Sequence, residues 1–345
     1  MSGLGLSELT DLLRSPFTHE DLWEAGGPVV VADLTSMPSD AGTLNDLRRR
    51  LLDLPAVTVA RVHEPVAGSE AEFVEAFDIV FAPGDAAGTA AVPIEDGPAA
   101  ATLAARVIEH PHASVALAQL LRLSAGASVS AALAAESFVY STLQGGPEFG
   151  AWLGDREPPA PDTRDDSPIR VERDESTMRL TLDRPERRNA FSARMRDAMV
   201  DALRAASADP ALDGVVLAGN GAAFCAGGDL AEFGTSPDPA TAHVVRSVRN
   251  PAYWLDQLGG RVRCEVHGAC VGAGIELPAF TPTIVAAADT TFALPEVGMG
   301  LVPGAGGTVS IPRRIGRHRT AWLAITGETL DATTARQWGL VDRVE

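Results

Sequence analysis

The stretch HGACVGAGIELPAF, residues 267–280, decides the fold of this chain. Glycines and small residues open it, and one acid, Glu276, then follows among apolar neighbours. Proline is tolerated in the first turn of a helix but not later, so Pro278 places a helix start just before it, after a small-residue turn. Glutamate is rarely buried without a partner. Either the helix dipole stabilises Glu276 at the helix start, or the carboxylate serves chemistry.

Two further stretches repeat this strand–turn–helix pattern. NGAAFCAGGDL, residues 220–230, follows a strand, and ALPEVGMGLVPGAGGT, residues 293–308, carries Glu296 ahead of a glycine-rich turn. The first matches neither the dinucleotide-binding G-x-G-x-x-G nor a P-loop. Taken alone, Glu296 reads equally well as a solvated loop carboxylate. Two helix starts, however, offer two N–H donors for an oxyanion, and two carboxylates supply acid–base chemistry. Together they indicate formation of an enolate from a thioester carbonyl.

The segment GDREPPAPDTRDDSP, residues 154–168, is the predicted linker, because it is rich in proline and aspartate and has little to bury. Downstream of it, short β-like runs alternate with helical patterns, which predicts an α/β architecture with crossover connections. Residues 28–81 show a weaker form of the same alternation between β-like and helical patterns, and we interpret them as a decayed copy of about 177–220. Residues 98–153 are almost purely helical in pattern.

Composition disfavours several classes of function. The 345 residues carry a formal net charge of −18, with a pI of about 4.8, which disfavours binding to nucleic acid or to an anionic membrane. Every basic residue other than histidine is an arginine, so an anion site must use arginine and backbone amides, and Schiff-base lysine chemistry is excluded. Cys225, Cys264 and Cys270 lack metal-ligand spacing. We see neither a signal peptide nor a membrane span, and expect a soluble, cytoplasmic protein.

Four ordered motifs resemble the enoyl-CoA hydratase/isomerase (crotonase) superfamily over residues 169–345: AFCAGGDL, HGACVGAGIEL, LPEVGMGLVPGAGGT and RRIGRHRTAWLAITGETLDATTARQWGLVDRV. The resemblance implies the crotonase fold, an α/β core of repeated ββα units that forms two roughly perpendicular sheets. Such cores usually assemble as trimers or dimers of trimers, so a homo-oligomer is expected. The implied substrate is an acyl-CoA, with no metal and no cofactor beyond the coenzyme A that the substrate carries.

The motifs also assign roles by position. The resemblance gives the oxyanion-hole amides to Ala226 and Ala273, and the handling of water to Glu276 and Glu296. The turn RPERRNAF, residues 184–191, matches the segment near the adenine and phosphates of coenzyme A. In this turn, Arg187 and Arg188 are candidate phosphate contacts and Ala190 is the candidate backbone contact, although the turn is also consistent with a basic surface turn in which Asn189 caps a helix. Asp229 and Leu230 are expected along the pantetheine channel. Tyr253 and Trp254 are expected over the acyl pocket, where they either narrow the pocket or merely pack.

The order of segments departs from the family pattern. Family members continue with several closing helices after GLVDRV, whereas here residues 98–153 resemble those helices. We therefore predict a rearranged crotonase, with a degenerate crotonase-like half at 1–97 ahead of these helices, the linker, and the catalytic core at 169–345. The helices should pack against the core, within one chain or across a subunit boundary. The degenerate half has neither acid, so one active site per chain is expected.

Hydration of a trans-2-enoyl-CoA to a 3-hydroxyacyl-CoA is the preferred function, because both acids are present. An enoyl-CoA isomerase, which needs one main carboxylate with Glu296 as the candidate, is the first alternative. Decarboxylation, hydrolysis and cofactor-free oxygenation are further crotonase-type reactions. The non-enzymatic alternative is a subunit that binds acyl-CoA without catalysis. The burial of two carboxylates without use argues against it, because burial of charge is costly.

Overall fold

A computed structural model describes residues 3–25, 27–35, 37–38, 40–83, 91–93, 98–157, 160 and 166–345. The C-terminal part of the chain forms a six-stranded sheet in the order β13-β10-β8-β7-β6-β5. The outermost strand, β5, is antiparallel to β6, and the other neighbours are parallel. The six strands are β5 (Ile169–Asp174), β6 (Thr177–Leu182), β7 (Gly214–Gly219), β8 (Val262–Val266), β10 (Thr283–Ala286) and β13 (Arg343–Val344).

A three-stranded sheet, β12-β11-β9, completes this core. The chain runs from β8 to β9 and then into a helix, and from β10 to β11 and then into another helical turn. Each ββα unit thus gives one strand to each sheet, which is the repeated unit that the resemblance implied. The elements are β9 (Ala269–Val271), β11 (Thr291–Ala293), β12 (Leu330–Asp331), α9 (Ala193–Ala208), α12 (Ala273–Glu276), η5 (Glu296–Met299), α13 (Gly307–Ile315), α14 (Arg317–Thr326) and α15 (Ala332–Trp338).

The N-terminal part forms a separate parallel sheet in the order β1-β2-β3-β4. Its strands are buried along nearly their whole length, as is typical of parallel sheets covered on both faces. Helices α1, α3 and α4 cover one face, and α5, α6 and α14 cover the other. The elements are α1 (Leu6–Arg14), α2 (Thr18–Glu24), β1 (Val29–Leu34), α3 (Ala41–Leu52), β2 (Val57–Val62), α4 (Gly68–Glu75), β3 (Ile79–Ala82) and β4 (Val92–Pro93).

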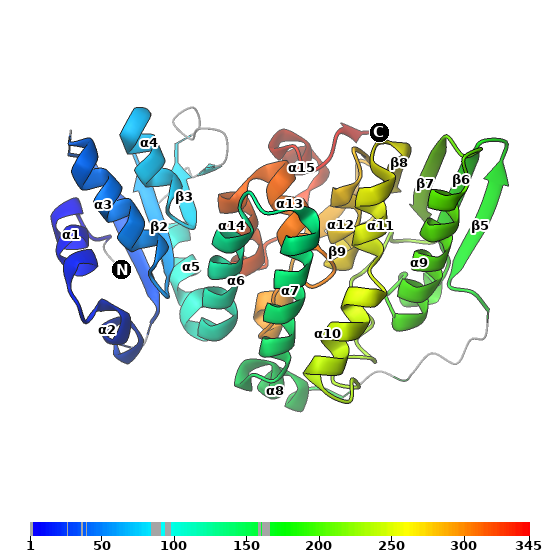
Figure 1. Ribbon diagram of the computed structural model, residues 1–345, viewed down its shortest axis with the longest axis horizontal. Coiled ribbons are helices and arrows are strands. Elements are labelled where there is room, and N and C mark those ends of the chain that lie inside the picture. Colours follow the sequence, from blue (N-terminus) through cyan, green and yellow to red (C-terminus); the bar gives the residue numbers. More distant parts are fainter. Residues whose placement is uncertain are drawn as a thin grey trace.

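Four helices lie between the N-terminal sheet and the C-terminal core (Figure 1). They are α5 (Pro98–Glu109), α6 (Pro111–Ser124), α7 (Val129–Gln144) and α8 (Pro147–Gly154). Helices α6 and α7 pack on α13, α5 packs on α14, and α8 contacts the turn η5. The expected packing of residues 98–153 against the core is therefore confirmed, and it occurs within one chain. The predicted linker, 154–168, lies partly outside the described residues. The interpretation of 1–97 as a degenerate crotonase-like half stays a prediction.

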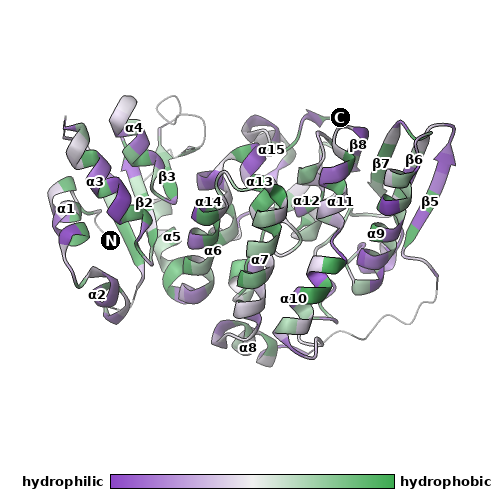
Figure 2. Ribbon diagram, in the orientation of Figure 1, coloured by the Kyte–Doolittle hydropathy of each residue, from purple (hydrophilic) through white to green (hydrophobic). Residues whose placement is uncertain are grey.

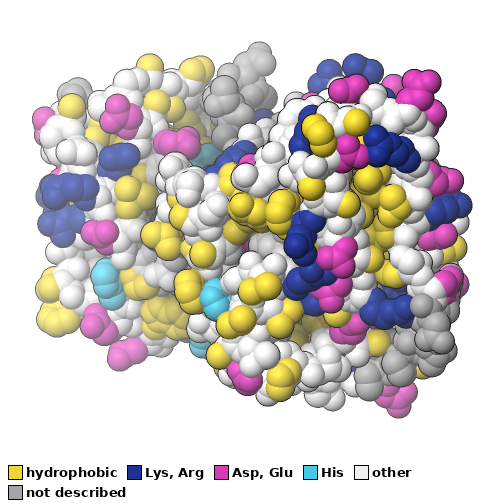
Figure 3. Space-filling model, turned by 45° about the vertical axis from the view of Figure 1, so that its right-hand side comes forward, with side chains coloured by type: hydrophobic (Ala, Val, Ile, Leu, Met, Phe, Trp, Pro, Cys, Tyr) yellow, Lys and Arg dark blue, Asp and Glu magenta, His cyan; other side chains and the backbone are white. Residues whose placement is uncertain are grey.

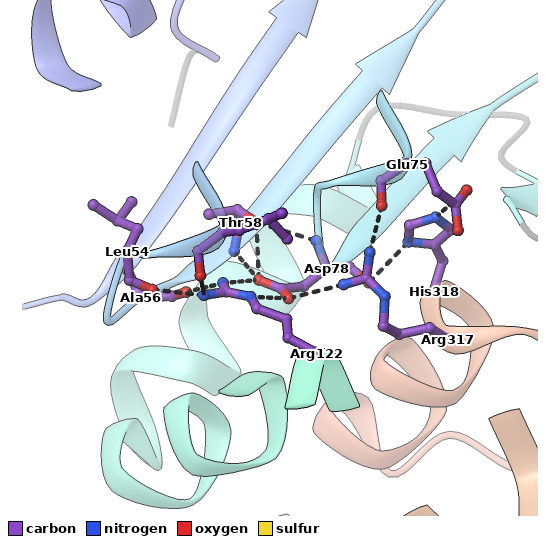
Figure 4. A network of polar contacts seen from close by, with 9 residues as sticks. Leu54, Ala56, Thr58, Glu75, Asp78, Arg122, Arg317 and His318 are labelled. Carbon is purple, nitrogen blue, oxygen red and sulfur yellow. Dashed lines mark hydrogen bonds and ion pairs between the residues drawn. The ribbon is translucent and has the colours of Figure 1, made fainter. Parts of the chain in front are cut away.

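A buried ionic network fixes the N-terminal sheet to these helices (Figure 4). The carboxylate of Asp78, only 1% exposed, binds the guanidinium groups of Arg122 on α6 and Arg317 on α14. It also accepts hydrogen bonds from the amide and hydroxyl of Thr58, each at 2.8 Å. Arg122 donates in addition to three backbone carbonyls, those of Leu52, Leu54 and Ala56. One carboxylate thus joins three segments that are far apart in the sequence.

Apolar residues concentrate on the strands and on the facing sides of the inner helices, whereas β5 at the sheet edge is mostly hydrophilic (Figure 2). On the face in Figure 3, basic and acidic side chains are interspersed with apolar ones and form no broad basic field. Within the described ranges, no helix is long and apolar enough to cross a membrane.

Candidate functional site

A cavity of about 240 Å³ opens where the helix α7 meets the C-terminal core. Its wall combines residues from both parts of the chain: Tyr140 and Gln144 of α7, residues 191–193 with Arg196 at the start of α9, residues 228–229 and 232–233, residues 246 and 249–251, and Ala273, Glu276, Glu296, Gly304 and Ala305. Glu276, Glu296 and Ala273, which the sequence analysis selected, all line it. The helical segment therefore contributes Tyr140 and Gln144 to the same cavity wall as these candidates.

Glu276 lies in the one-turn helix α12, as the position of Pro278 predicted. Its side chain is 2% exposed, and its Oε2 accepts hydrogen bonds from the amides of Ala305, at 2.7 Å, and Gly307, at 2.8 Å. These amides lie just before α13 and at its first turn, where backbone N–H groups have no partner within the helix. Burial raises the pKa of Glu276 to about 7, and the two amide donors partly oppose that rise.

Glu296 begins the turn η5 and faces Glu276 across Gly272. Gly272 has φ +50°, and a Cβ there would lie 2.4 Å from Glu296 Oε1, so only glycine fits this turn. The other oxygen, Glu296 Oε2, is buried and has no hydrogen-bond partner among the described residues. Burial, followed by the charge of Glu276, raises the pKa of Glu296 well above its usual value. A buried carboxyl oxygen without a partner suits a water molecule or a proton transfer.

One of the two predicted oxyanion donors is wrong. The amide of Ala226 donates to the carbonyl of Arg188, at 3.0 Å, and Ala226 does not line the cavity. Gly228, two residues further on, does line it, and its amide has no acceptor within the described part of the chain. The bridge between Phe191 and Gly228 uses the groups on either side of Gly228, so the Gly228 amide points away from Phe191.

Ala273, the other predicted donor, is the first residue of α12 and lines the cavity. Its amide likewise has no acceptor in the residues that the structure describes, because the N–H groups of a first helical turn lack intrahelical partners. Gly228 and Ala273 thus each offer this wall a backbone donor that has no acceptor among the described residues. This pair is what an oxyanion hole requires.

The structure places a third buried acid, Glu136 of α7, next to this site, and the sequence patterns did not predict it. It is 3% exposed and accepts from the amides of Gly306, at 2.7 Å, and Thr308, at 3.0 Å, and from the Thr308 hydroxyl at 2.6 Å. Burial and the neighbouring charge of Glu276 raise the pKa of Glu136 to about 8. The four amides of residues 305–308 therefore alternate between Glu276 and Glu136. The signal was the single acid in the apolar run SAALAAESFVY, 130–140, analogous to the one in 267–280.

The predicted coenzyme A turn, 184–191, borders the cavity through its last residue, Phe191, whereas Arg187, Arg188 and Ala190 lie outside the wall. Arg187 Nη2 donates to the carbonyl of Ala160 at 2.6 Å. The Arg188 side chain is exposed on a residue with φ +50°. These positions leave the arginine side chains at the rim, and their contact with phosphate stays a prediction.

Asp229 and Leu230 differ in their surroundings. Asp229 lines the cavity, but its carboxylate is buried against the guanidinium of Arg184, with both contacts at 3.2 Å. Leu230 is 37% exposed and is not in the wall. The predicted helix cap at Asn189 is wrong: Ser192 caps α9, and the buried Asn189 amide instead bridges the backbone.

Tyr253 and Trp254 do not line this cavity, so of the two predicted roles the structure supports packing. Both lie on α11 (Pro251–Leu258), and only residues 250 and 251, at its start, reach the cavity. Their rings contact each other edge to face at 5.3 Å between centroids. Tyr253 is 38% exposed, and Trp254 packs on the core from outside. The neighbouring helix α10 (Pro239–Val248) supplies Arg246 to the wall instead.

Comparison with known proteins defines the class. The sequence profile described as Enoyl-CoA hydratase/isomerase matches residues 172–345. The chain is 34% identical over 180 residues to the 2,3-dehydroadipyl-CoA hydratase of Escherichia coli, covering 52% of this chain and 69% of that protein. It is 35% identical over 175 residues to the 1,2-epoxyphenylacetyl-CoA isomerase of the same organism, covering 50% and 67%. A crystal structure of an enoyl-CoA hydratase from Mycobacterium smegmatis matches at 34% identity over 52% of this chain and 70% of that one, with a TM-score of 0.48.

The chain therefore belongs to the enoyl-CoA hydratase/isomerase (crotonase) family. It is an enzyme of the crotonase type that acts on an acyl-CoA.

Proposed function

We propose that the chain hydrates a trans-2-enoyl-CoA to a 3-hydroxyacyl-CoA. The observation that carries this proposal is the pair Glu276 and Glu296, two buried carboxyls with raised pKa in one cavity wall. The unpaired amides of Gly228 and Ala273 support it, because they can hold the enolate oxygen of a thioester. The reaction requires no cofactor beyond the coenzyme A of the substrate and no metal.

The two acids take different roles because their surroundings differ. Glu276 has two amide donors that stabilise its charge, so it acts as the base that takes a proton from water. The water oxygen bonds to the β-carbon while the thioester oxygen becomes an enolate held by Gly228 and Ala273. Glu296, whose buried Oε2 has no partner among the described residues and whose pKa burial raises well above its usual value, gives a proton to the α-carbon. The proton on Glu276 then passes to Glu296 as the next water binds.

Glu276→Gln and Glu296→Gln test this mechanism separately, with hydration of crotonyl-CoA followed by loss of the ultraviolet absorbance of the enoyl thioester. General acid–base groups contribute about 10²–10⁴-fold, so each variant should lose activity on that scale. Glu172→Gln, on the exposed strand β5, is the matched control and should keep full rate. Full activity in both cavity variants contradicts the mechanism.

One observation favours isomerisation of a 3-enoyl-CoA as the second candidate. Glu276 is held by two amides, whereas Glu296 has the buried oxygen without a partner, and an isomerase needs one proton-shuttling carboxylate. Under this alternative, Glu296→Gln abolishes activity on 3-enoyl-CoA, Glu276→Gln retains most of it, and wild type leaves crotonyl-CoA unhydrated.

We also propose that residues 98–153 serve as the closing helices of the catalytic core at 169–345, because Glu136, Tyr140 and Gln144 reach the site from α7. A homo-oligomer, a trimer or hexamer, is proposed from the family resemblance. Light scattering of the purified protein measures its mass directly, and a monomer rejects that assembly.

A further inference from the structure

Arg246 is a partly buried cation in the cavity wall whose partners are all neutral. Its guanidinium donates from Nε to Ser137 Oγ at 3.2 Å, from Nη1 to Gln144 Oε1 at 3.2 Å, and from Nη2 to Ser141 Oγ. It also lies over the ring of Tyr140, 4.7 Å from the centroid. Through the described ranges no carboxylate comes within ion-pair distance of it.

The other two arginines of this wall differ from Arg246. Arg249 pairs with Asp197 at 3.1 Å and with Asp201 at 3.0 Å, and Arg196 pairs with Asp197 at 2.9 Å. Two carboxylates thus balance these two guanidinium groups. Burial without a counter-charge is costly, and it lowers the pKa of the Arg246 guanidinium. A ligand that brings a negative charge would therefore be stabilised next to Arg246.

Arg246 has enough N–H groups left over to bind such a ligand. A guanidinium has five N–H groups, and the three contacts with α7 use one on each nitrogen. One N–H remains on each terminal nitrogen, which is the number that a carboxylate accepts in a bidentate pair. Glu276, an acid of the same cavity wall, has a pKa raised to about 7 and carries reduced charge near neutral pH, which weakens its repulsion of an incoming carboxylate.

The position of Arg246 identifies which part of the substrate bears that charge. The Arg246 guanidinium lies over the ring of Tyr140, and that ring lies against Gly304, where a Cβ would come within 2.3 Å of it. The next residue, Ala305, donates to Glu276. Arg246 and Glu276 thus line the same cavity and are linked through Tyr140 and residues 304–305. The phosphates of coenzyme A are separated from the thioester by the whole pantetheine arm, so they cannot reach it from a productive pose.

We propose that Arg246 binds a carboxylate at the far end of a short acyl chain, so that the substrates are CoA thioesters of dicarboxylic acids. This inference rests on the proposed function for the identity of the reaction, but not for the binding preference. The cavity of about 240 Å³ suits a short chain.

The test compares glutaconyl-CoA with trans-2-pentenoyl-CoA, which carries a methyl group where the former has its carboxylate. Charge-assisted hydrogen bonds contribute about 1.5–3 kcal/mol, so wild type should favour glutaconyl-CoA in kcat/KM by about 10–100-fold. Arg246→Met should remove this preference, and Arg246→Lys should restore part of it. Arg249→Met, which removes an arginine already balanced by aspartates, should keep the ratio.

The ratio separates binding from a purely structural role, because loosening α7 from α10 would slow both substrates alike. An unchanged ratio in Arg246→Met, or a wild-type preference for pentenoyl-CoA, overturns the inference. If wild type turns over neither substrate, hydration is rejected. Calorimetry with glutaryl-CoA and valeryl-CoA then decides the carboxylate preference on its own.

Discussion

Replacing Glu136 by glutamine tests whether α7 only covers the active site or helps to hold it together. The carboxylate accepts from Gly306 on one oxygen and from the amide and hydroxyl of Thr308 on the other. A glutamine has one oxygen, so its NH₂ must face an N–H donor on one side. A buried donor left without an acceptor costs about 1–3 kcal/mol, and we expect the free energy of unfolding to fall by that amount. Urea denaturation measures it.

Glu136→Gln should also lower the rate of the reaction, because the amides that it displaces alternate along the chain with those that hold Glu276. A shift of about 1 Å in a catalytic group can cost about 10²-fold in rate, and kcat/KM for crotonyl-CoA should fall towards that scale. The charge of Glu136 is also among the causes that raise the pKa of Glu296. Its removal should lower that pKa, so the alkaline limb of the rate profile moves to lower pH.

Glu109→Gln is the control for this experiment, since that side chain is exposed on α5 and its partners are the neighbouring Arg106, at 2.9 Å, and His110, at 3.9 Å. It should change stability by no more than about 0.5 kcal/mol. Glu136→Gln with wild-type stability, rate and pH profile would refute the reasoning, and α7 would then be a passive cover. Lost stability with an unmoved pH profile would limit Glu136 to a structural role.

Gly272→Ala should reduce kcat/KM for crotonyl-CoA by about 10²-fold, because its Cβ would displace Glu296; a rate within twofold of wild type contradicts the close approach. Asp78→Ala should lower the free energy of unfolding by about 3–5 kcal/mol in urea, because it leaves buried arginines unpaired; a loss below 1 kcal/mol would mean that the network is dispensable. Glu136 and Glu276 have a usual pKa of 4.5 and folded values of about 8 and about 7, so the folded state binds more protons than the unfolded state between these limits. Stability should therefore fall as pH rises from about 4.5 to about 8, and a urea midpoint that rises over this window contradicts the burial of these acids.

The local patterns predicted the core and the two acids of the cavity wall, Glu276 and Glu296, because their causes are local. Pro278 fixes where α12 starts, and small residues fix the turn before it, so Glu276 could be placed from fourteen residues. The packing of 98–153 on the core was predictable from resemblance. Glu136 was not, because its partners Gly306 and Thr308 are 170 and 172 residues away, and only the folded chain brings them together.

The error at Ala226 has a physical cause that the motif does not reveal. In an extended segment, amides two residues apart point to the same side, so Ala226 and Gly228 would be equivalent. Gly227 between them has φ +99°, which turns the chain and sends the two amides to different acceptors. The prediction for Tyr253 and Trp254 was limited for a similar reason. The sequence indicated that residues 246–258 border the pocket, but not which of their side chains face it.

The alternating amides of residues 305–308 have a consequence for how the protein is made. Ribosomes release α5–α8 before the loop that receives Glu136 has been translated. Until then the apolar faces of α6 and α7 lack their final neighbours, and the acid on α7 has nothing to accept from. Docking of the segment that carries residues 305–308 then covers the apolar faces of α6 and α7 and supplies the amides that Glu136 and Glu276 accept from.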